Sequence, residues 1–138
     1  RSSLLLKRVF DILEGKVKNK KICFLGVTFK ANTDDMRDSS SLSMIPSLIK
    51  KGAKVNYFDP TGEKVEFKKL KNVTFSSNIS SAIKNSNLII IHTEWNDFKS
   101  INFKKEIKNN KFIIFDMRNI YSPIEMKDLK IKYFGVGC

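Results

Sequence analysis

Hydrophobic positions along the chain fall into two kinds of segment. Short runs that are apolar without interruption are typical of buried strands, and 87–91 (Asn-Leu-Ile-Ile-Ile) is the clearest of them. Other segments place apolar residues three or four positions apart, as amphipathic helices do. The pattern predicts strands over 21–26, 54–58, 73–75, 87–91, 111–115 and 131–134. It predicts helices over 4–13, 39–51, 77–84, 103–108 and 123–129.

Strands and helices follow one another in turn along all 138 residues. Two strands joined through a helix run parallel, and such helices cover both faces of the sheet. We therefore expect an α/β fold, with a doubly wound parallel sheet of about six strands in a Rossmann-like three-layer sandwich. Pro46 lies inside the second predicted helix and should kink it or shift its start.

Three polar loops follow the first, fourth and fifth predicted strands, over 27–38, 92–95 and 116–119. In a doubly wound sheet, ligands bind at the carboxyl ends of the strands, near the point where the strand order reverses. The first loop is also longer than the roughly 2–6 residues of most strand-to-helix connections. Long polar loops on a rigid sheet often carry binding residues, so these three loops form the candidate site.

Three basic side chains of these loops, Lys30, Arg37 and Arg118, should converge at one edge of a parallel sheet. A lysine point charge together with planar guanidinium groups is the chemistry that binds a diphosphate. The serine run 39–41 opens the following helix, where backbone N–H groups would add donors for an anion. The loops therefore predict a site for a ligand that contains a diphosphate.

Two aromatic residues and two acids lie on the same loops. Phe29 and Trp95 could offer flat surfaces to a base or sugar, and packing in or around the core is the alternative for both. Packing is the favoured interpretation for Trp95. Of the neighbours Asp34 and Asp35, one is expected to pin the loop or to orient Arg37.

The first strand-to-helix turn argues against an independent dinucleotide site. It contains one glycine, Gly26, whereas the GxGxxG fingerprint uses several so that the backbone can approach a pyrophosphate. Asp59 ends the second strand, where a ribose-binding acid would lie, but the following Pro60 favours a role in starting a turn. His92 has no nucleophile paired with it in sequence, which favours a structural role over that of a general base.

The chain carries 26 Lys+Arg against 14 Asp+Glu, a formal net charge of +12. A basic nucleic-acid-binding domain is therefore an alternative from another class. Only four of the basic residues are Arg, the residue that base-edge and phosphate recognition favour, and the lysines are spread out apart from a denser stretch over 64–71. We favour a solvated basic surface without a nucleic-acid partner.

The remaining composition excludes other classes of protein. No apolar run approaches the ~20 residues of a membrane span, so no membrane partner is expected. Cys23, Cys138 and the single His92 have no metal-binding spacing, and no metal site is expected. A buried Cys23 and a free terminal thiol fit a cytoplasmic protein. The start at Arg1 suggests a piece of a longer polypeptide.

Several motifs share their order with a known family. They are 25–30 (Leu-Gly-Val-Thr-Phe-Lys), 32–39 (Asn-Thr-Asp-Asp-Met-Arg-Asp-Ser), Gly52, 57–60 (Tyr-Phe-Asp-Pro), 93–95 (Thr-Glu-Trp), Phe98, 115–119 (Phe-Asp-Met-Arg-Asn) and 133–137 (Tyr-Phe-Gly-Val-Gly). Over residues 20–138 the chain resembles the C-terminal, UDP-binding domain of the UDP-glucose/GDP-mannose dehydrogenase family, most of all its UDP-glucose 6-dehydrogenase branch. The combination is more specific than any single motif.

The resemblance implies that Phe29, Lys30 and Arg118 contact a UDP-sugar and that Arg37 reaches across a domain cleft to the pyrophosphate of NAD. The family oxidises the sugar C6 alcohol to a carboxylate in two NAD-dependent hydride transfers through a cysteine thioester, converting UDP-glucose to UDP-glucuronate. The family's catalytic cysteine and NAD-binding domain lie upstream of this domain. No catalytic residue is therefore expected in this segment, which should be inactive alone.

The resemblance also implies a division of the chain and its partners. Residues 1–19 would end a linker helix from the dimer-forming core, and 20–138 would form the UDP-sugar-binding domain. The partners would be the N-terminal and central domains of the same polypeptide, in a homodimer or a larger assembly. The shared motifs leave other nucleotide sugars open as substrates, such as UDP-N-acetylmannosamine and GDP-mannose. A stand-alone NAD-binding Rossmann module is a third interpretation, weakened by the missing glycines.

Overall fold

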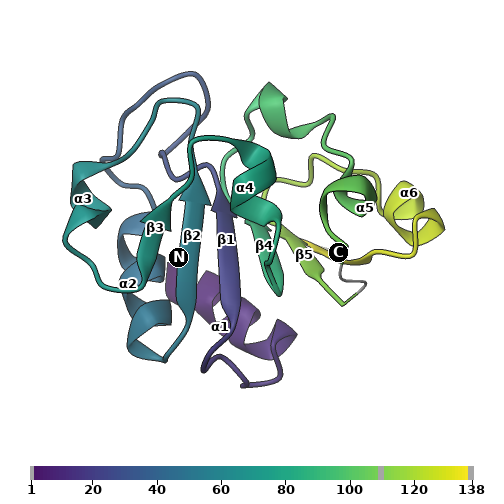
Figure 1. Ribbon diagram of the computed structural model, residues 1–138, viewed down its shortest axis with the longest axis horizontal. Coiled ribbons are helices and arrows are strands. Elements are labelled where there is room, and N and C mark those ends of the chain that lie inside the picture. Colours follow the sequence, from purple (N-terminus) through teal and green to yellow (C-terminus); the bar gives the residue numbers. More distant parts are fainter. Residues whose placement is uncertain (1, 109–110, 137–138) are drawn as a thin grey trace.

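The computed structural model describes residues 2–108 and 111–136, and within them six strands form one parallel sheet (Figure 1). The strands are β1 (Lys21–Leu25), β2 (Lys54–Phe58), β3 (Val73–Phe75), β4 (Leu88–Ile91), β5 (Ile113–Asp116) and β6 (Lys132–Gly135). The helices are α1 (Ser2–Ile12), α2 (Ser41–Lys50), α3 (Val65–Lys68), α4 (Ile79–Ile83), α5 (Phe103–Glu106) and α6 (Pro123–Asp128), with a 3₁₀ helix η1 (Asn96–Phe98).

The strand order is β3-β2-β1-β4-β5-β6. From β1 the chain winds outward to β3, then crosses to the other side of β1 and winds outward again to β6. The order therefore reverses between β1 and β4, which are hydrogen-bonded neighbours in parallel register. This is the switch point at which a doubly wound sheet binds its ligands. The predicted doubly wound parallel sheet is confirmed.

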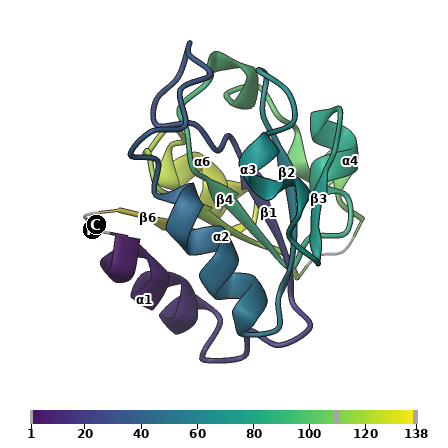
Figure 2. The ribbon, with the colours of Figure 1, turned by 90° about the vertical axis from the view of Figure 1, so that its left-hand side faces the viewer.

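Alternate strand residues supply the two halves of the core. On β1, Ile22 and Phe24 pack toward α1, α2 and α3, whereas Cys23 and Leu25 pack toward α4, α5 and α6. Because both faces are covered, the strand is apolar at each of these positions, as the sequence pattern indicated. Figure 2 shows α1 and α2 side by side on one face of the sheet, which confirms the three-layer sandwich.

The first helix is held against the last strands. The guanidinium of Arg8 donates from one terminal nitrogen to the carbonyl oxygen of Gly135 at 2.9 Å. Its central carbon lies 5.8 Å from the ring centres of both Phe115 and Phe134. Such cation–π contacts add to the apolar burial of the helix. The division after residue 19 stays a prediction, although α1 packs as part of the same sandwich.

Most element boundaries lie within two residues of the prediction. Helix α2 begins at Ser41 rather than at residue 39, with Pro46 inside it. Two short elements were missed, α3 in the lysine-rich stretch and η1 after the fourth strand. Each is at most four residues long, too short to show a helical period. Cys138, expected as a free thiol, lies outside the described residues.

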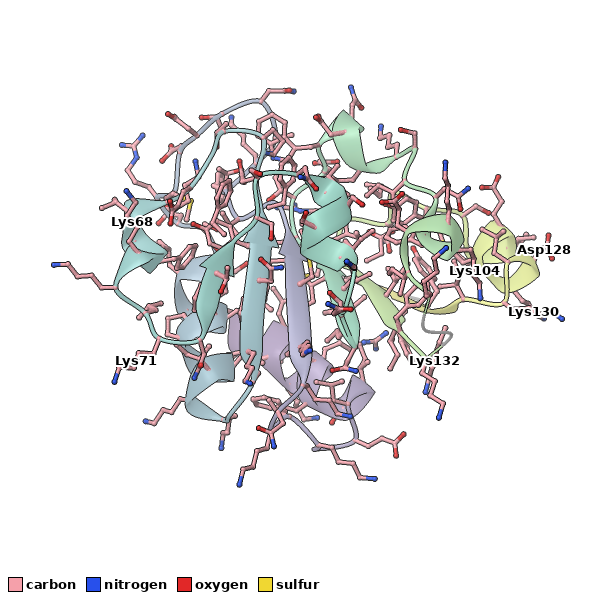
Figure 3. All side chains as sticks on the ribbon, viewed as in Figure 1. Lys68, Lys71, Lys104, Asp128, Lys130 and Lys132 are labelled. Carbon is pink, nitrogen blue, oxygen red and sulfur yellow. The ribbon has the colours of Figure 1, made fainter. Side chains whose placement is uncertain are left out.

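The basic surface residues do not gather at one place. In Figure 3, Lys68 and Lys71 project at the end of the molecule that carries α3, whereas Lys104, Lys130 and Lys132 project at the opposite end. This arrangement favours a solvated surface over one continuous basic stripe. Within the described ranges, no helix is long and apolar enough to cross a membrane.

Candidate functional site

Three loops meet at the carboxyl edge of the sheet, at the switch point. Arg118, in the loop after β5, donates from Nε to the carbonyl oxygen of His92 at 3.0 Å and from a terminal nitrogen to that of Phe29 at 3.1 Å. The Thr93 hydroxyl, after β4, donates to the carbonyl oxygen of Thr28 at 3.0 Å. The predicted convergence of the loops after β1, β4 and β5 is therefore confirmed.

Arg118 supplies a positive charge and also acts as a clamp, because it is hydrogen-bonded to two separate loops. A guanidinium has five N–H donors in a planar fork. The two directed at the Phe29 and His92 carbonyls hold separate loops together, and they leave three without a partner among the described residues. Sequence reasoning placed Arg118 at this edge but did not find the clamp, because its two acceptors are backbone atoms 89 and 26 residues away.

Phe29 and Lys30 lie on a loop whose start is internally bonded. The Phe29 N–H donates to the Asp35 carbonyl at 3.0 Å, and the Thr28 hydroxyl donates to the Lys30 carbonyl at 2.9 Å. The backbone is held while both side chains remain outside, with 47% of Phe29 exposed. An exposed ring and an exposed ammonium on a braced loop are free to meet a ligand. Phe29 is therefore not a core residue, and its contact with a ligand stays a prediction.

Arg37 is paired with a neighbouring carboxylate. Its Nε and a terminal nitrogen each lie 3.1 Å from an oxygen of Asp35, and its backbone N–H donates to the same carboxylate at 2.9 Å. The side-chain hydrogen bond from Arg37 is the main cause that lowers the pKa of Asp35 below its ordinary value. The Arg37 side chain is still 88% exposed. The expectation that one of the two acids orients Arg37 is confirmed.

The serine run is turned inward. The hydroxyls of Ser39 and Ser41 both donate to the Val27 carbonyl at 2.6 Å, which closes the base of the loop. The backbone N–H groups of 41–44 are engaged at the start of the helix, with Ser39 and Ser40 as acceptors. Most N–H groups of this segment are therefore already engaged, and the expectation that the run 39–41 serves an anion stays a prediction.

His92 is buried directly after β4, with 1% of its surface exposed. Its Nε2 lies 2.9 Å from the Ser40 hydroxyl and its Nδ1 lies 3.0 Å from the Thr93 hydroxyl. Burial, with a smaller contribution from the nearby charge of Arg118, lowers the pKa of His92 to about 3. The imidazole is neutral at physiological pH and fully bonded, which supports the structural interpretation over a general base.

Two buried carboxylates shape the loops. Asp59, at the end of β2, accepts from the Val27 N–H at 2.9 Å and from the hydroxyl of Thr61 at 2.6 Å. It is 1% exposed and holds a turn, as its position before Pro60 indicated, so it offers no ribose contact. Asp116 accepts from the Arg118 N–H at 3.1 Å.

The role of Asp116 was missed. Its second oxygen accepts from the Tyr121 N–H at 3.0 Å and from the Tyr133 hydroxyl at 2.7 Å. The carboxylate is fully buried and thereby fixes the turn that carries Arg118. Buried charges are retained where hydrogen bonds satisfy them. An acid that directly follows a buried apolar strand was the signal in the sequence.

The remaining candidate groups are enclosed in the core. Trp95 is 8% exposed and packs there, as favoured. Cys23 is fully buried, and burial raises the pKa of its thiol above the ordinary range. A thiol in that state is a poor nucleophile. Among the described residues, no group of three His, Cys, Asp or Glu side chains could hold a metal ion.

Two open grooves lie at the opposite, amino edge of the sheet. One of about 350 Å³ is lined by Lys54, Asn56 and Asn72 among others. A second, of about 700 Å³, includes Lys84 and Lys105. None of the candidate site residues lines either groove. The candidate site is instead an exposed set of side chains on braced loops.

This fold and site define an α/β domain of the doubly wound class, with its polar loops at the switch point between β1 and β4. Residues 23–123 match the sequence profile of the UDP-glucose/GDP-mannose dehydrogenase family, UDP binding domain. The chain belongs to this family.

Individual relatives agree with the family. The UDP-glucose 6-dehydrogenase of Rickettsia felis is 36% identical over 140 residues, which cover 99% of this chain and 31% of the relative. That of Rickettsia bellii is 37% identical over 141 residues, covering 99% of this chain and 32% of the relative. The chain thus spans about a third of the length of these relatives.

Solved structures show the same fold at lower identity. The NDP-N-acetyl-D-galactosaminuronic acid dehydrogenase of Methanosarcina mazei superposes with a TM-score of 0.79 at 24% identity, over 99% of this chain and 28% of that one. A UDP-glucose dehydrogenase of Pyrobaculum islandicum superposes with a TM-score of 0.75 at 22% identity. The superposition covers 98% of this chain and 29% of that one. At these identities the similarity establishes the fold alone.

Proposed function

We propose that the chain binds the UDP-sugar substrate of an NAD-dependent UDP-glucose 6-dehydrogenase, as part of a longer polypeptide. The observation that carries the proposal is the switch-point geometry: exposed Phe29 and Lys30 lie on the loop to which Arg118 is bonded. The names of the relatives from Rickettsia supply the substrate class.

Each of the three residues has a role that its chemistry suits. The exposed ring of Phe29 offers a flat face for the uracil or the sugar. Lys30 supplies a mobile positive charge, and the free N–H groups of Arg118 supply a planar fork for the diphosphate. Because Arg118 also bonds the Phe29 carbonyl, the backbone that carries the ring is held next to the guanidinium.

The cofactor of the proposed reaction is NAD, which accepts hydride from C6 of the sugar. Arg37 suits its pyrophosphate, since its side chain is 88% exposed and its guanidinium is held by Asp35 through two hydrogen bonds. None of the described residues is placed to act as the nucleophile, because Cys23 lies inside the sheet. Chemistry and most of the NAD site are therefore assigned to the other domains of the polypeptide.

The assembly is part of the same proposal. The N-terminal and central domains of the polypeptide are the proposed partners, and the complete enzyme is proposed to be a homodimer or larger. The chain spans about a third of its relatives, which leaves ample length for both domains. A cytoplasmic location, expected from the sequence, also remains part of the proposal.

Isothermal titration calorimetry of the complete polypeptide with UDP-glucose tests the function. Lys30→Ala and Arg118→Ala should each weaken binding at least tenfold, which corresponds to about 1.4 kcal/mol, within the range for lost charge-assisted hydrogen bonds. Arg118→Lys keeps the charge but loses the clamp and should recover little affinity. Unchanged affinity in both alanine variants would contradict the proposal. The 138-residue chain alone should not reduce NAD.

A further inference from the structure

Thr93, His92 and Ser40 form one hydrogen-bonded network at the site, and the positions of their nitrogen and oxygen atoms determine which group donates in each bond. The Thr93 hydroxyl has a single hydrogen, and it is donated to the Thr28 carbonyl at 3.0 Å. The Nδ1 of His92, 3.0 Å from the same hydroxyl oxygen, must then be the donor in that contact. A neutral imidazole carries one N–H, so Nε2 is an acceptor and receives the hydrogen of the Ser40 hydroxyl at 2.9 Å.

The hydroxyl of Ser40 is committed to this network. Ser40 precedes the first turn of α2, where a serine side chain ordinarily accepts from the backbone of its own helix. Here its side chain makes no such capping bond. Its hydroxyl lies against His92 instead, across 52 residues of sequence. The contact therefore serves to link the loop to β4 rather than to start the helix.

The network is hydrogen-bonded to both ends of the loop that follows β1. Through Thr93 it holds the carbonyl of Thr28, directly before Phe29, and through Ser40 it holds the point where the loop enters α2. The main chain of His92 also accepts from Arg118. The imidazole of His92 thus connects Ser40 with Thr93, and its main-chain carbonyl connects β4 with the segment that carries Arg118.

We propose that His92 is a positioning residue, a neutral imidazole in the Nδ1–H form that fixes the loop bearing Phe29 and Lys30 in its binding conformation. This inference rests on the function proposed above. A loop already held in its bound conformation loses less entropy when a ligand arrives, so the affinity is greater. His92 touches no ligand in this scheme and acts through Thr93 and Ser40.

The first test is the tautomer itself. The chain has one histidine, so its ring nitrogens can be read by long-range ¹H–¹⁵N NMR on the labelled 138-residue chain without ambiguity. The wild-type chain should show the Nδ1–H form. Thr93→Val is isosteric but removes the acceptor, so the population should move to the Nε2–H form, which can donate to Ser40. Thr93→Ser retains the hydroxyl and should keep the wild-type spectrum.

An Nε2–H form in the wild-type chain, or a tautomer that Thr93→Val leaves unchanged, would overturn the inference. Both outcomes are independent of any ligand, because they report only the direction of the hydrogen bonds. The tautomer therefore remains measurable even if the proposed substrate is wrong.

The second test concerns affinity and uses a matched serine. Ser40→Ala removes the donor to Nε2, whereas Ser43→Ala removes a hydroxyl that bonds only the turn of its own helix, at 3.2 Å to the Ser40 carbonyl. In the complete polypeptide, Ser40→Ala should weaken UDP-glucose binding about five- to tenfold, the value of one hydrogen bond. Ser43→Ala should change it less than about twofold. Ser40→Ala leaves the buried Nε2 of His92 without a donor and should lower the melting temperature more than Ser43→Ala, so both titrations are run below the melting transition of each variant.

Failures of the two proposals are distinguishable. If the wild-type polypeptide does not bind UDP-glucose but the Nδ1–H tautomer is observed, the proposed function fails and the hydrogen-bond assignment stands. If UDP-glucose binds and Ser40→Ala behaves like Ser43→Ala, the positioning role fails and the proposed function stands.

Discussion

The two edges of the sheet differ in whether their polar side chains are buried and hydrogen-bonded or exposed to solvent. At the carboxyl edge, His92, Asp59 and Asp116 are buried and hydrogen-bonded, and the loops around them are cross-linked through backbone carbonyls. At the amino edge, exposed lysines and amides line two open grooves. The two grooves of about 350 and 700 Å³ lie at the amino edge, whereas these buried hydrogen-bonded polar groups lie at the carboxyl edge. Burial of satisfied polar groups, rather than hollow volume, marks the candidate site.

The difference follows from what each edge requires. An unbraced loop would have to be ordered when a ligand binds, at a cost in free energy. At the carboxyl edge the loops are already ordered when the chain folds, because hydrogen bonds connect distant segments there. At the amino edge, side-chain hydrogen bonds such as that from the Lys21 N–H to Oδ1 of Asn87 at 2.8 Å also connect distant segments, but the side chains involved are half-buried rather than fully buried, and the groove lysines are exposed. Three substitutions or changes of condition probe this contrast.

The largest effect is expected from close packing at the carboxyl edge. Gly26 has φ +78°, and an added Cβ would lie 2.5 Å from the Cβ of Thr93. Gly26→Ala combines a left-handed backbone with overpacking and should lower the free energy of unfolding by about 3 kcal/mol or more. Chemical denaturation measures it. The amino-edge counterpart is Gly52→Ala, where the nearest atoms are Cγ, Cα and Cβ of Lys18 at 3.1–3.3 Å, a milder contact that a shift of a few tenths of an ångström would relieve.

Gly52→Ala should therefore cost less, about 1–2 kcal/mol, most of it from the left-handed backbone. Equal losses for the two variants would show that the two edges are packed alike and would remove the contrast.

A drop in pH should act next, through His92. Its pKa is about 3 in the folded chain against 6.5 for the free side chain. Below pH 6.5 the unfolded state therefore binds a proton that the folded state does not, and stability falls with pH until the folded pKa is reached. The loss from this group is about 1.4 kcal/mol per pH unit, or about 2 kcal/mol between pH 6.5 and pH 5.

Urea denaturation of the wild-type chain and His92→Gln at both pH values isolates the effect, since the carboxylates contribute equally to each. The wild-type chain should lose about 2 kcal/mol more than the variant on acidification. Parallel pH curves for the two proteins would mean that His92 is not held neutral.

The smallest effect is expected at the amino-edge grooves. Lys84→Ala and Lys105→Ala remove charge from the walls of the 700 Å³ groove. Calorimetry with UDP-glucose on the complete polypeptide should show less than about a twofold change, because screened surface charges at that distance contribute little. A loss as large as that of Lys30→Ala would move the binding site to the amino edge.

The sequence predicted more of the fold than of the hydrogen bonds at the site. Unbroken apolar runs such as Leu88–Ile91 and helical spacing on α2 were sufficient to obtain the sheet and its crossovers. The meeting of three loops followed from parallel strands alone. Short helices such as α3 lack enough residues for a period. The Arg37 pair was foreseeable because its partner is two positions away.

The inward serines and the Arg118 clamp were not predictable in the same way. Whether Ser39 points outward to an anion or inward to Val27 depends on how closely α2 approaches β1. Arg118 finds backbone carbonyls, which every residue possesses, so no residue type in the sequence identifies its acceptors. Such contacts are determined by the tertiary structure and cannot be predicted from the residue types alone.

The bond from Arg8 to Gly135 joins residues 127 positions apart, and this separation has a consequence for synthesis. The first helix emerges from a ribosome long before strand β6 exists. The contacts of α1 with β6 can therefore form only at the end of synthesis. Contacts between distant parts of a chain are closed late and slow the folding of a domain. Until β6 is made, Arg8 lacks its carbonyl acceptor and one of its two aromatic neighbours, so the docking of α1 is completed only when the last strand has been synthesised.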